Sequence, residues 1–252
     1  MDLDGKTILL TGASGGIGSI TAQELLQRGA HVIAHYASRR DDAEAACAGA
    51  PDRATLVQAD LSHLGGARTL WREAINHHDR IDAVVINAAT MPETHLDGDD
   101  EQWDEGWERT LRVNVLEPAS LAREAVKHFI ANDGGTLIGL SSWAAERGSA
   151  IPHLAAYGAS KAAIRNLLQT IARNYAHQGV LAYVVAPGIV RTPLSEIAAT
   201  YRGGIEAVNA ILPMGAMVEP IEVARLIAFL ASGAAPNLTG GTIDLNGASH
   251  IR

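Results

Sequence analysis

A tyrosine and a lysine four residues apart are the first candidates for chemistry in this sequence. Tyr157 and Lys161 occupy positions i and i+4, which share one face of a helix. A free phenol has a pKa near 10, too high for a general base at neutral pH, and a neighbouring ammonium favours the phenolate. Taken alone, such a pair is more often an ordinary solvated one. Its meaning therefore depends on the elements that surround it.

A glycine-rich run near the N-terminus suggests a second kind of chemistry. The run Thr11-Gly12-Ala13-Ser14-Gly15-Gly16-Ile17-Gly18 follows an apolar segment and opens a helical pattern. Glycines let the backbone approach a pyrophosphate, and a helix N-terminus offers free amides and the positive end of a dipole. The alternative is a turn that only needs positive φ angles. The position after a strand favours a phosphate-binding loop.

Short apolar runs alternate with longer helical patterns along the chain. Strands are predicted at 6–11, 31–36, 54–59, 82–87, 135–141, 180–186 and 241–245, and helices at 17–28, 41–48, 66–77, 107–130, 154–177 and 220–232. This alternation predicts an α/β fold, a doubly wound parallel sheet of about seven strands with helices on both faces. We expect a single domain over 1–252, with substrate loops near 90–105, 149–154 and 192–217.

The order of the motifs resembles the short-chain dehydrogenase/reductase family, near its 3-oxoacyl-carrier-protein reductase-like branch, over almost the whole chain. The glycine run matches the family's T-G-x-x-x-G-x-G loop, and Tyr157 to Lys161 matches its Y-x-x-x-K. The further matches are Asp60-Leu61, Asn87-Ala88-Ala89 (with Ala89 for a glycine), Trp107 with Asn114, Ser141-Ser142, and Pro187-Gly188-Ile189-Val190-Arg191-Thr192. The resemblance implies a Rossmann-type fold and hydride transfer between a nicotinamide cofactor and a carbonyl or secondary alcohol.

The resemblance also implies which residues act. Tyr157 would give a proton to the carbonyl oxygen, Ser142 would hold that oxygen, Lys161 would hold the ribose, and Asn114 would position a water that relays protons to Lys161. Ser142 is preferred to Ser141 because Gly148 keeps its place relative to Ser142, which assigns the extra residues to 149–154. The implied cofactor contacts are Gly12, Ser14, Gly16, Ile17, Gly18, Tyr36, Ser38, Arg39, Asp60, Leu61, Asn87, Ala88, Ala89, Tyr157, Lys161, Pro187, Gly188, Ile189 and Thr192.

The end of the second strand bears on the choice of cofactor. NAD selectivity usually needs a carboxylate there for the ribose 2′-hydroxyl, and the run from Tyr36 to Arg40 has none. Ser38 and Arg39 can bind a 2′-phosphate instead. Gly15 argues the other way, because many NADP-preferring members of the family carry Lys or Arg at that position. The sequence therefore favours NADP(H) over NAD(H).

Composition narrows the class of partner. The 252 residues carry a formal charge of -8, which argues against nucleic acid or an anionic membrane. No apolar run approaches the ~20 residues of a membrane span. Cys47 is the single cysteine and the N-terminal residues lack a signal-peptide pattern, so we expect a cytoplasmic protein with a small-molecule substrate. His77-His78 has no helical i, i+4 partner, so no metal site is predicted.

Helix 154–177 carries more apolar residues than one stripe facing a sheet requires. In the family that the chain resembles, this helix and helix 107–130 pair across two-fold axes, so we expect a homo-oligomer, a tetramer. Two other functions stay open. One is a nucleotide-binding regulatory protein of the same fold without turnover. The other is an epimerase or dehydratase, for which little chain follows the last strand. The substrate itself is not readable, although Ile189, Leu194, Ile197, Ile205, Ile211, Leu212 and Met217 suggest a partly apolar lid.

Overall fold

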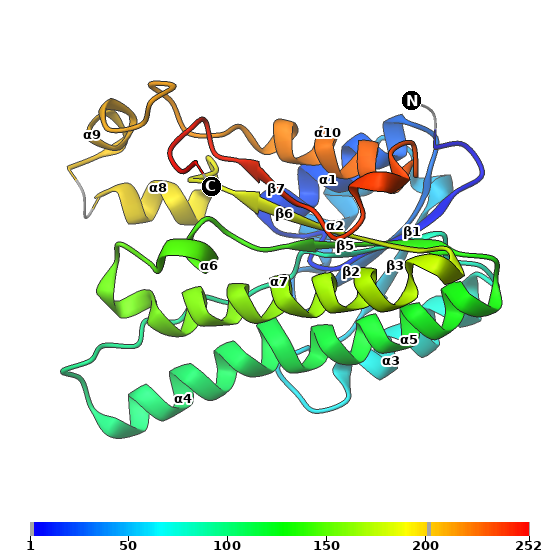
Figure 1. The fold of residues 1–252 in the computed structure, drawn as a ribbon, viewed down its shortest axis with the longest axis horizontal. Coiled ribbons are helices and arrows are strands. Elements are labelled where there is room, and N and C mark those ends of the chain that lie inside the picture. Colours follow the sequence, from blue (N-terminus) through cyan, green and yellow to red (C-terminus); the bar gives the residue numbers. More distant parts are fainter. Residues whose placement is uncertain (1–2, 201–202, 252) are drawn as a thin grey trace.

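The chain folds around one parallel sheet of seven strands, as a computed structural model describing residues 3–200 and 203–251 shows (Figure 1). The strands are β1 Thr7–Leu10, β2 His31–Tyr36, β3 Ala54–Gln58, β4 Ala83–Ile86, β5 Gly135–Leu140, β6 Val180–Pro187 and β7 Thr242–Leu245. Their order is β3-β2-β1-β4-β5-β6-β7, and every neighbouring pair is parallel. The strand order reverses between β1 and β4, which is where such sheets open a crevice for ligands. The predicted doubly wound fold is confirmed.

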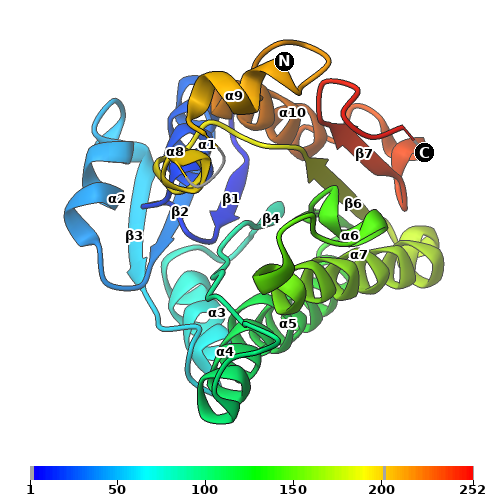
Figure 2. The same cartoon turned by 90° about the vertical axis from the view of Figure 1, so that its left-hand side faces the viewer.

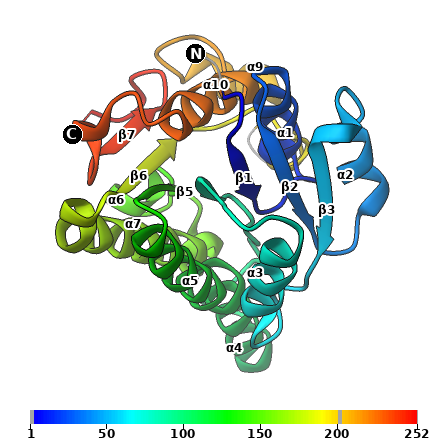
Figure 3. The same ribbon diagram turned by 90° about the vertical axis from the view of Figure 1, so that its right-hand side faces the viewer.

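Helices cover both faces of the sheet (Figure 3). One face carries α1 Gly16–Gln27, α2 Arg40–Cys47 and α10 Pro220–Ala231, and the other carries α3 Gly66–His77, α5 Glu117–Ala131 and α7 Ala155–Tyr175, with α4 Asp100–Leu111 beyond them. Three short helices gather beyond the carboxyl end of β6 (Figures 1 and 2): α6 Ala144–Arg147, α8 Pro193–Thr200 and α9 Ile205–Ala210. They surround the place where a ligand of this fold would bind.

The core lies in two layers, one on each side of the sheet. Ile8 and Leu10 of β1 face the cluster that includes α1 and α10, whereas Leu9 between them faces the cluster that includes α3, α5 and α7. All three are fully buried. A strand buried on both faces has no need of polar residues, which explains why the central strands read as nearly continuous apolar runs.

The predicted helix 107–130 differs most from the structure. It begins earlier, at Asp100, because the Asp99 carboxylate caps it by accepting the N–H groups of Glu101 and Gln102 at 2.9 and 3.2 Å. A π-helical turn, Arg112–Leu116, then separates α4 from α5. Helix α6 was not predicted, and α8 and α9 occupy a segment that the sequence left unassigned. The described part of the chain has no helix long and apolar enough to cross a membrane.

Candidate active site

A cavity of about 290 Å³ lies at the carboxyl ends of the central strands. Its wall is mostly apolar, and each of the three predicted substrate loops contributes to it: Met91 from the first, Ser149, Ala150, Ile151 and Leu154 from the second, and Thr192, Ser195, Ala199 and Val208 from the third. The expectation that the extra residues 149–154 border the substrate space fits this wall. Ser142, Tyr157 and Lys161 are brought together in the same cavity.

Tyr157, Ser142 and Lys161 come from two adjoining elements. Tyr157 and Lys161 lie one turn apart on α7, with the Lys161 Nζ 5.6 Å from the Tyr157 ring centroid. Ser142 follows the end of β5 and is hydrogen-bonded with Tyr157. The Lys161 side chain is 5% exposed, and its Nζ donates to the Leu140 carbonyl at 2.8 Å. The hydroxyl, the phenol and the ammonium therefore meet at one wall of the cavity.

Burial dominates the ionisation of this pair. It raises the pKa of Tyr157, and the hydrogen bond with Ser142 opposes that rise. Burial also lowers the pKa of Lys161 from 10.5 to about 8. In the protein alone, burial is therefore the main influence on the pKa of Tyr157. The predicted stabilisation of the phenolate by the Lys161 ammonium concerns the enzyme with its cofactor bound and stays a prediction. At neutral pH the phenol keeps its proton and can donate it.

The two adjacent serines have different contacts. The Ser141 hydroxyl donates to the Lys161 carbonyl at 2.9 Å, which fixes the end of β5 against α7. The Ser142 hydroxyl accepts the Ala144 N–H at 3.2 Å and is the one bonded with Tyr157. Of the two hydroxyls, the one of Ser142, which the sequence spacing favours, is therefore the one beside the Tyr157 phenol.

Asn114 lies outside the cavity wall, in the π-helical turn. Its side-chain oxygen accepts the Thr90 N–H at 2.8 Å, and its amide donates to the Thr90 carbonyl at 2.9 Å and to the Ser160 hydroxyl at 3.0 Å. The side chain is 2% exposed. Asn114 thus fastens the loop after β4 to α7 beside Lys161, at the turn where the helix is interrupted.

The glycine loop has the shape that a dinucleotide requires. Helix α1 starts at Gly16 with Gly15 as its N-cap, and no side chain caps it, which leaves a positive helix end for a pyrophosphate. Gly12 has a φ of +73°, and a Cβ on Gly18 would lie 2.0 Å from the Gly12 carbonyl oxygen. The loop therefore admits no side chains at these points. The uncapped helix end and the phenol–ammonium pair fit a nicotinamide dinucleotide.

Thr11 and Asn87 join the glycine loop to β4 across the crevice. The Thr11 hydroxyl accepts the N–H groups of Asn87 and Ala88 at 2.9 and 3.0 Å. The Asn87 amide donates back to the Thr11 carbonyl at 2.9 Å. Ala88 lies under the loop, with its Cα 3.0 Å from where a Cβ on Gly12 would be, and Ala89 lines the cavity. Thr11 was not among the predicted site residues, although its hydroxyl ties the two strands together.

His35 is a second residue that the sequence did not single out. Its Nε2 lies 3.0 Å from the Ala59 carbonyl oxygen, and its Nδ1 accepts the Gly12 N–H at 3.1 Å. A carbonyl can only accept, so the proton of the neutral ring is on Nε2. Burial lowers the pKa of His35 and favours this neutral form. The imidazole therefore connects the glycine loop to the strand end before Asp60. A polar residue inside an apolar strand was the available signal.

The remaining predicted cofactor residues lie at the ends of β2 and β3. The Tyr36 side chain is buried, and its hydroxyl accepts a hydrogen bond from Arg40 at 3.1 Å. Ser38 and Arg39 are exposed, and a guanidinium nitrogen of Arg39 would be 3.9 Å from a Cβ placed on Gly15. Asp60 is exposed and Leu61 is buried. These residues flank the glycine loop on the side away from Tyr157.

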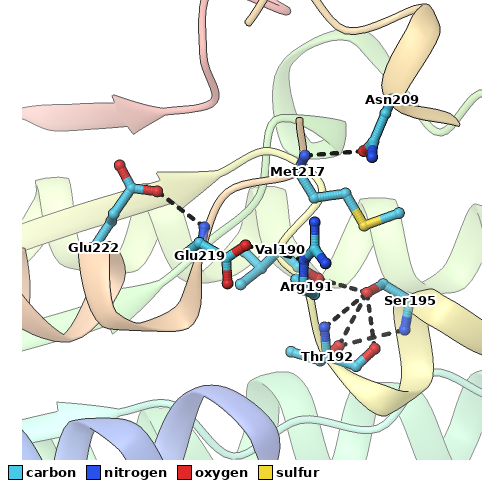
Figure 4. A network of polar contacts seen from close by, with 8 residues as sticks. All are labelled: Val190, Arg191, Thr192, Ser195, Asn209, Met217, Glu219 and Glu222. Carbon is cyan, nitrogen blue, oxygen red and sulfur yellow. Dashed lines mark hydrogen bonds and ion pairs between the residues drawn. The ribbon is translucent and has the colours of Figure 1, made fainter. Parts of the chain in front are cut away.

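The segment after β6 is held by a group of polar contacts (Figure 4). The Ser195 hydroxyl donates to the Val190 carbonyl at 2.5 Å and accepts the Thr192 N–H at 2.9 Å. Arg191 pairs with Glu219 at 3.0 Å. The segment crosses the glycine loop, because a Cβ on Gly16 would lie 2.8 Å from the Thr192 methyl group. Pro187, Gly188, Ile189 and Thr192 line the cavity beside it.

The residues predicted to form an apolar lid differ in where they lie relative to the cavity. Leu212 and Met217 pack with Ala199 and Val208 in a small cluster of their own, against which Ile189 and Ile205 also pack. Ile211 is exposed. The side chains of Leu194 and Ile197 lie outside the described residues. Of the seven predicted lid residues, Ile189 lines the cavity.

Comparison with known proteins decides the family. Residues 12–250 match the family model described as enoyl-(acyl carrier protein) reductase. The chain is 33% identical over 256 residues to 3beta-hydroxysteroid dehydrogenase 1 of Eggerthella lenta, covering 98% of this chain and 94% of that protein. It belongs to the short-chain dehydrogenase/reductase family.

Solved structures of this family agree in fold. One is a 3-oxoacyl (acyl-carrier-protein) reductase from Agrobacterium tumefaciens C58 with NADP bound, with a TM-score of 0.88, 30% identity and coverage of 98% of this chain and 95% of that chain. Another is a 3-ketoacyl-(acyl-carrier-protein) reductase from Brucella melitensis complexed with NADH, with a TM-score of 0.86, 25% identity and coverage of 99% and 100%. The predicted family and reaction class are confirmed. This short-chain dehydrogenase/reductase is a nicotinamide-dependent oxidoreductase, and a regulatory protein without turnover is not favoured.

Proposed function

We propose that this oxidoreductase interconverts a carbonyl and a secondary alcohol with Tyr157 as general acid and base. The observation that carries the proposal is the meeting of Tyr157, Ser142 and Lys161 at one wall of a largely apolar cavity. A nicotinamide cofactor, when bound, supplies or accepts the hydride. The cofactor contacts are those predicted from the sequence, from the glycine loop to Thr192.

The roles of the side chains follow from their contacts. In reduction, the Ser142 hydroxyl holds the carbonyl oxygen and Tyr157 gives that oxygen its phenolic proton. The Lys161 ammonium stabilises the phenolate that this leaves, and Lys161 holds the cofactor ribose. Asn114 acts through Thr90 and Ser160, keeping α7 and the loop after β4 in register beside a water that resupplies protons. Oxidation of the alcohol reverses the transfer.

A substrate screen tests the reaction class. Ketones, aldehydes and sugars are incubated with NADPH or NADH, and loss of the reduced cofactor is followed together with formation of the alcohol. We expect turnover of at least one carbonyl compound. Tight cofactor binding without turnover of any of them would favour the regulatory protein instead.

NADP(H) is proposed as the preferred cofactor, because no carboxylate stands at the end of β2 and Arg39 lies beside the glycine loop. Arg39→Gln should weaken NADPH binding about 10-fold, since a charge-assisted phosphate contact is lost, and should leave NADH binding nearly the same. Arg72→Gln is the matched control, because exposed Arg72 lies on α3 and is not among the proposed cofactor contacts. Tighter binding of NADH than of NADPH by the wild type would contradict the preference.

A homotetramer in the cytoplasm is proposed as the working form. Leu116, Ile130 and Tyr175 are 48%, 38% and 37% exposed at the ends of α5 and α7, apolar area that a second copy would cover. Light scattering tests the assembly. A particle of 26.5 kDa at micromolar concentration would be a monomer and would contradict it.

A further inference from the structure

The cavity wall carries two charged side chains among the residues that the structure describes, Lys161 and Arg147. Lys161 is buried and already engaged with the Leu140 carbonyl at 2.8 Å. Arg147 is the last residue of the short helix α6, and its side chain is exposed to solvent and lines the cavity. The described wall contains no Asp or Glu. Arg147 is therefore a cation at the cavity mouth that no acidic wall residue neutralises.

The guanidinium of Arg147 is held in place while most of its donors stay available. Its central carbon lies 4.9 Å from the ring centroid of Trp143, a cation–π contact that leaves the N–H edge open. One nitrogen donates to the Ser249 carbonyl in the C-terminal segment at 3.3 Å. An arginine has five N–H donors, so this bond uses few of them. The neighbouring Glu146 pairs with Arg165 of α7.

We propose that Arg147 anchors a carboxylate on the substrate, so that the cavity takes a molecule with an apolar body, a carbonyl or alcohol at Tyr157 and a carboxylate at its far end. The inference rests on the proposed function, because it places the reacting carbon at Tyr157. A carboxylate is favoured over a phosphate because one guanidinium matches a monoanion in charge and in planar geometry. The protein's net charge of -8 repels anions, so such a substrate needs a local cation.

The two ends of the proposed substrate lie on opposite sides of α6. Ser142 precedes this helix and Arg147 is its last residue, so four residues stand between them in the chain. We therefore expect several methylene groups between the carbonyl and the carboxylate of the substrate. A short oxo acid should not reach both Tyr157 and Arg147.

Pairs of probes that differ only in charge test this inference. The probes are 7-oxooctanoate and 9-oxodecanoate, each beside its neutral amide, with 4-oxopentanoate and its amide as the short pair. We expect wild type to prefer each long acid over its amide about 5-fold in kcat/KM, the upper range for a partly exposed ion pair, and to show no such preference for the short pair. Added salt should reduce the preference.

Variants separate the anchor from a structural role. Arg147→Gln should bring the acid-to-amide ratio of the long probes close to one, and Arg147→Glu should invert it. Arg72→Gln removes the same charge from α3 outside the cavity wall, and should keep the wild-type ratio. A second readout needs no turnover: the affinities of octanoate and octanamide for the enzyme–cofactor complex are measured from the rise in melting temperature that each causes. The ratio of these two affinities should change in the Arg147 variants as the acid-to-amide ratio of kcat/KM does.

The inference is overturned if wild type treats acid and amide alike in both readouts. It is also overturned if Arg147→Gln weakens both probes equally, because Arg147 would then only fasten the C-terminal segment. Reduction of other ketones in either case leaves the proposed function standing. Failure of the enzyme to reduce any carbonyl compound would instead contradict the proposed function itself.

Discussion

Tyr157 and Lys161 show how much the environment of a residue changes its chemistry. Their spacing on one helix face was readable from the sequence, but the directions of their pKa shifts were not. Burial of Lys161 behind the end of β5 lowers its pKa to about 8, and burial raises the pKa of Tyr157. These effects depend on what packs around α7, which one segment of sequence does not contain. The different contacts of the Ser141 and Ser142 hydroxyls were not readable from the sequence either.

The lysine pKa predicts a pH dependence of the rate. Reduction needs the Lys161 ammonium to stabilise the phenolate, and this ammonium is present below about pH 8 and is lost above it. We therefore expect kcat/KM for ketone reduction to fall as the pH rises through about 8, approaching tenfold per pH unit. Initial rates in buffers of constant ionic strength measure this. A rate that stays constant from neutral pH to well above 9 would show that Lys161 has no such role.

The elements were predicted well where burial alone defines them. All seven strands were predicted in the correct places. Five of them are almost wholly buried apolar runs, and the less buried edge strands β3 and β7 keep the alternation of strand and helix patterns. The π-helical turn at Arg112–Leu116 was missed, because no pattern in its sequence separates a π-helical turn from an α-helix. Its Asn114 is hydrogen-bonded to Thr90 and Ser160, which come from other elements. Contacts across elements also hid the role of His35.

His35 gives a prediction at the scale of the elements, because it connects the ends of β1, β2 and β3. An asparagine oxygen can replace Nδ1 and accept the Gly12 N–H, whereas a glutamine amide can replace Nε2 and reach the Ala59 carbonyl. Loss of one buried hydrogen-bond partner costs about 1–3 kcal/mol. We expect His35→Gln to weaken NADPH binding about 10-fold or more and His35→Asn to weaken it less.

Titration calorimetry with NADPH measures this difference, and the melting temperature of each variant serves as its control. If both variants bind NADPH as tightly as wild type while losing stability, His35 only supports the fold. If the glutamine variant binds better than the asparagine variant, the bond to Gly12 is not the important one.

At the scale of the whole molecule, four partly or fully buried histidines predict how stability depends on pH. Burial is the main cause that lowers the pKa of His31, His35, His78 and His128 from 6.5. The rings of His31 and His78 also lie 4.1 Å apart at a tilted angle, and His78 further lowers the pKa of His31. His77-His78 has no partner within its own helix pattern, but His78 contacts His31 and Thr55 from other strands. Such pairs across strands cannot be located without the fold.

The sign follows from proton binding. In the unfolded chain these histidines have a pKa of 6.5, whereas in the folded protein their pKa values are lower. Between the two pKa values the unfolded state therefore binds more protons than the folded state. The stability is present above pH 6.5 and is lost as the pH falls below it. The melting temperature should decrease by a few degrees between about pH 7.5 and about pH 5.5. Calorimetry at constant ionic strength checks this, and a melting temperature that rises toward acid pH would refute it.

Direct hydride transfer with Tyr157 as the acid is the central claim, and transfer of a label tests it most directly. NADPH carrying deuterium at both C4 positions of the nicotinamide is incubated with a ketone that the enzyme reduces, and the alcohol is analysed by mass spectrometry. Wild type should deliver one deuterium to the carbinol carbon. Tyr157→Phe should form labelled alcohol at least about 100-fold more slowly while binding NADPH as before. An alcohol without label, or a Tyr157→Phe variant with a near wild-type rate, would contradict the account.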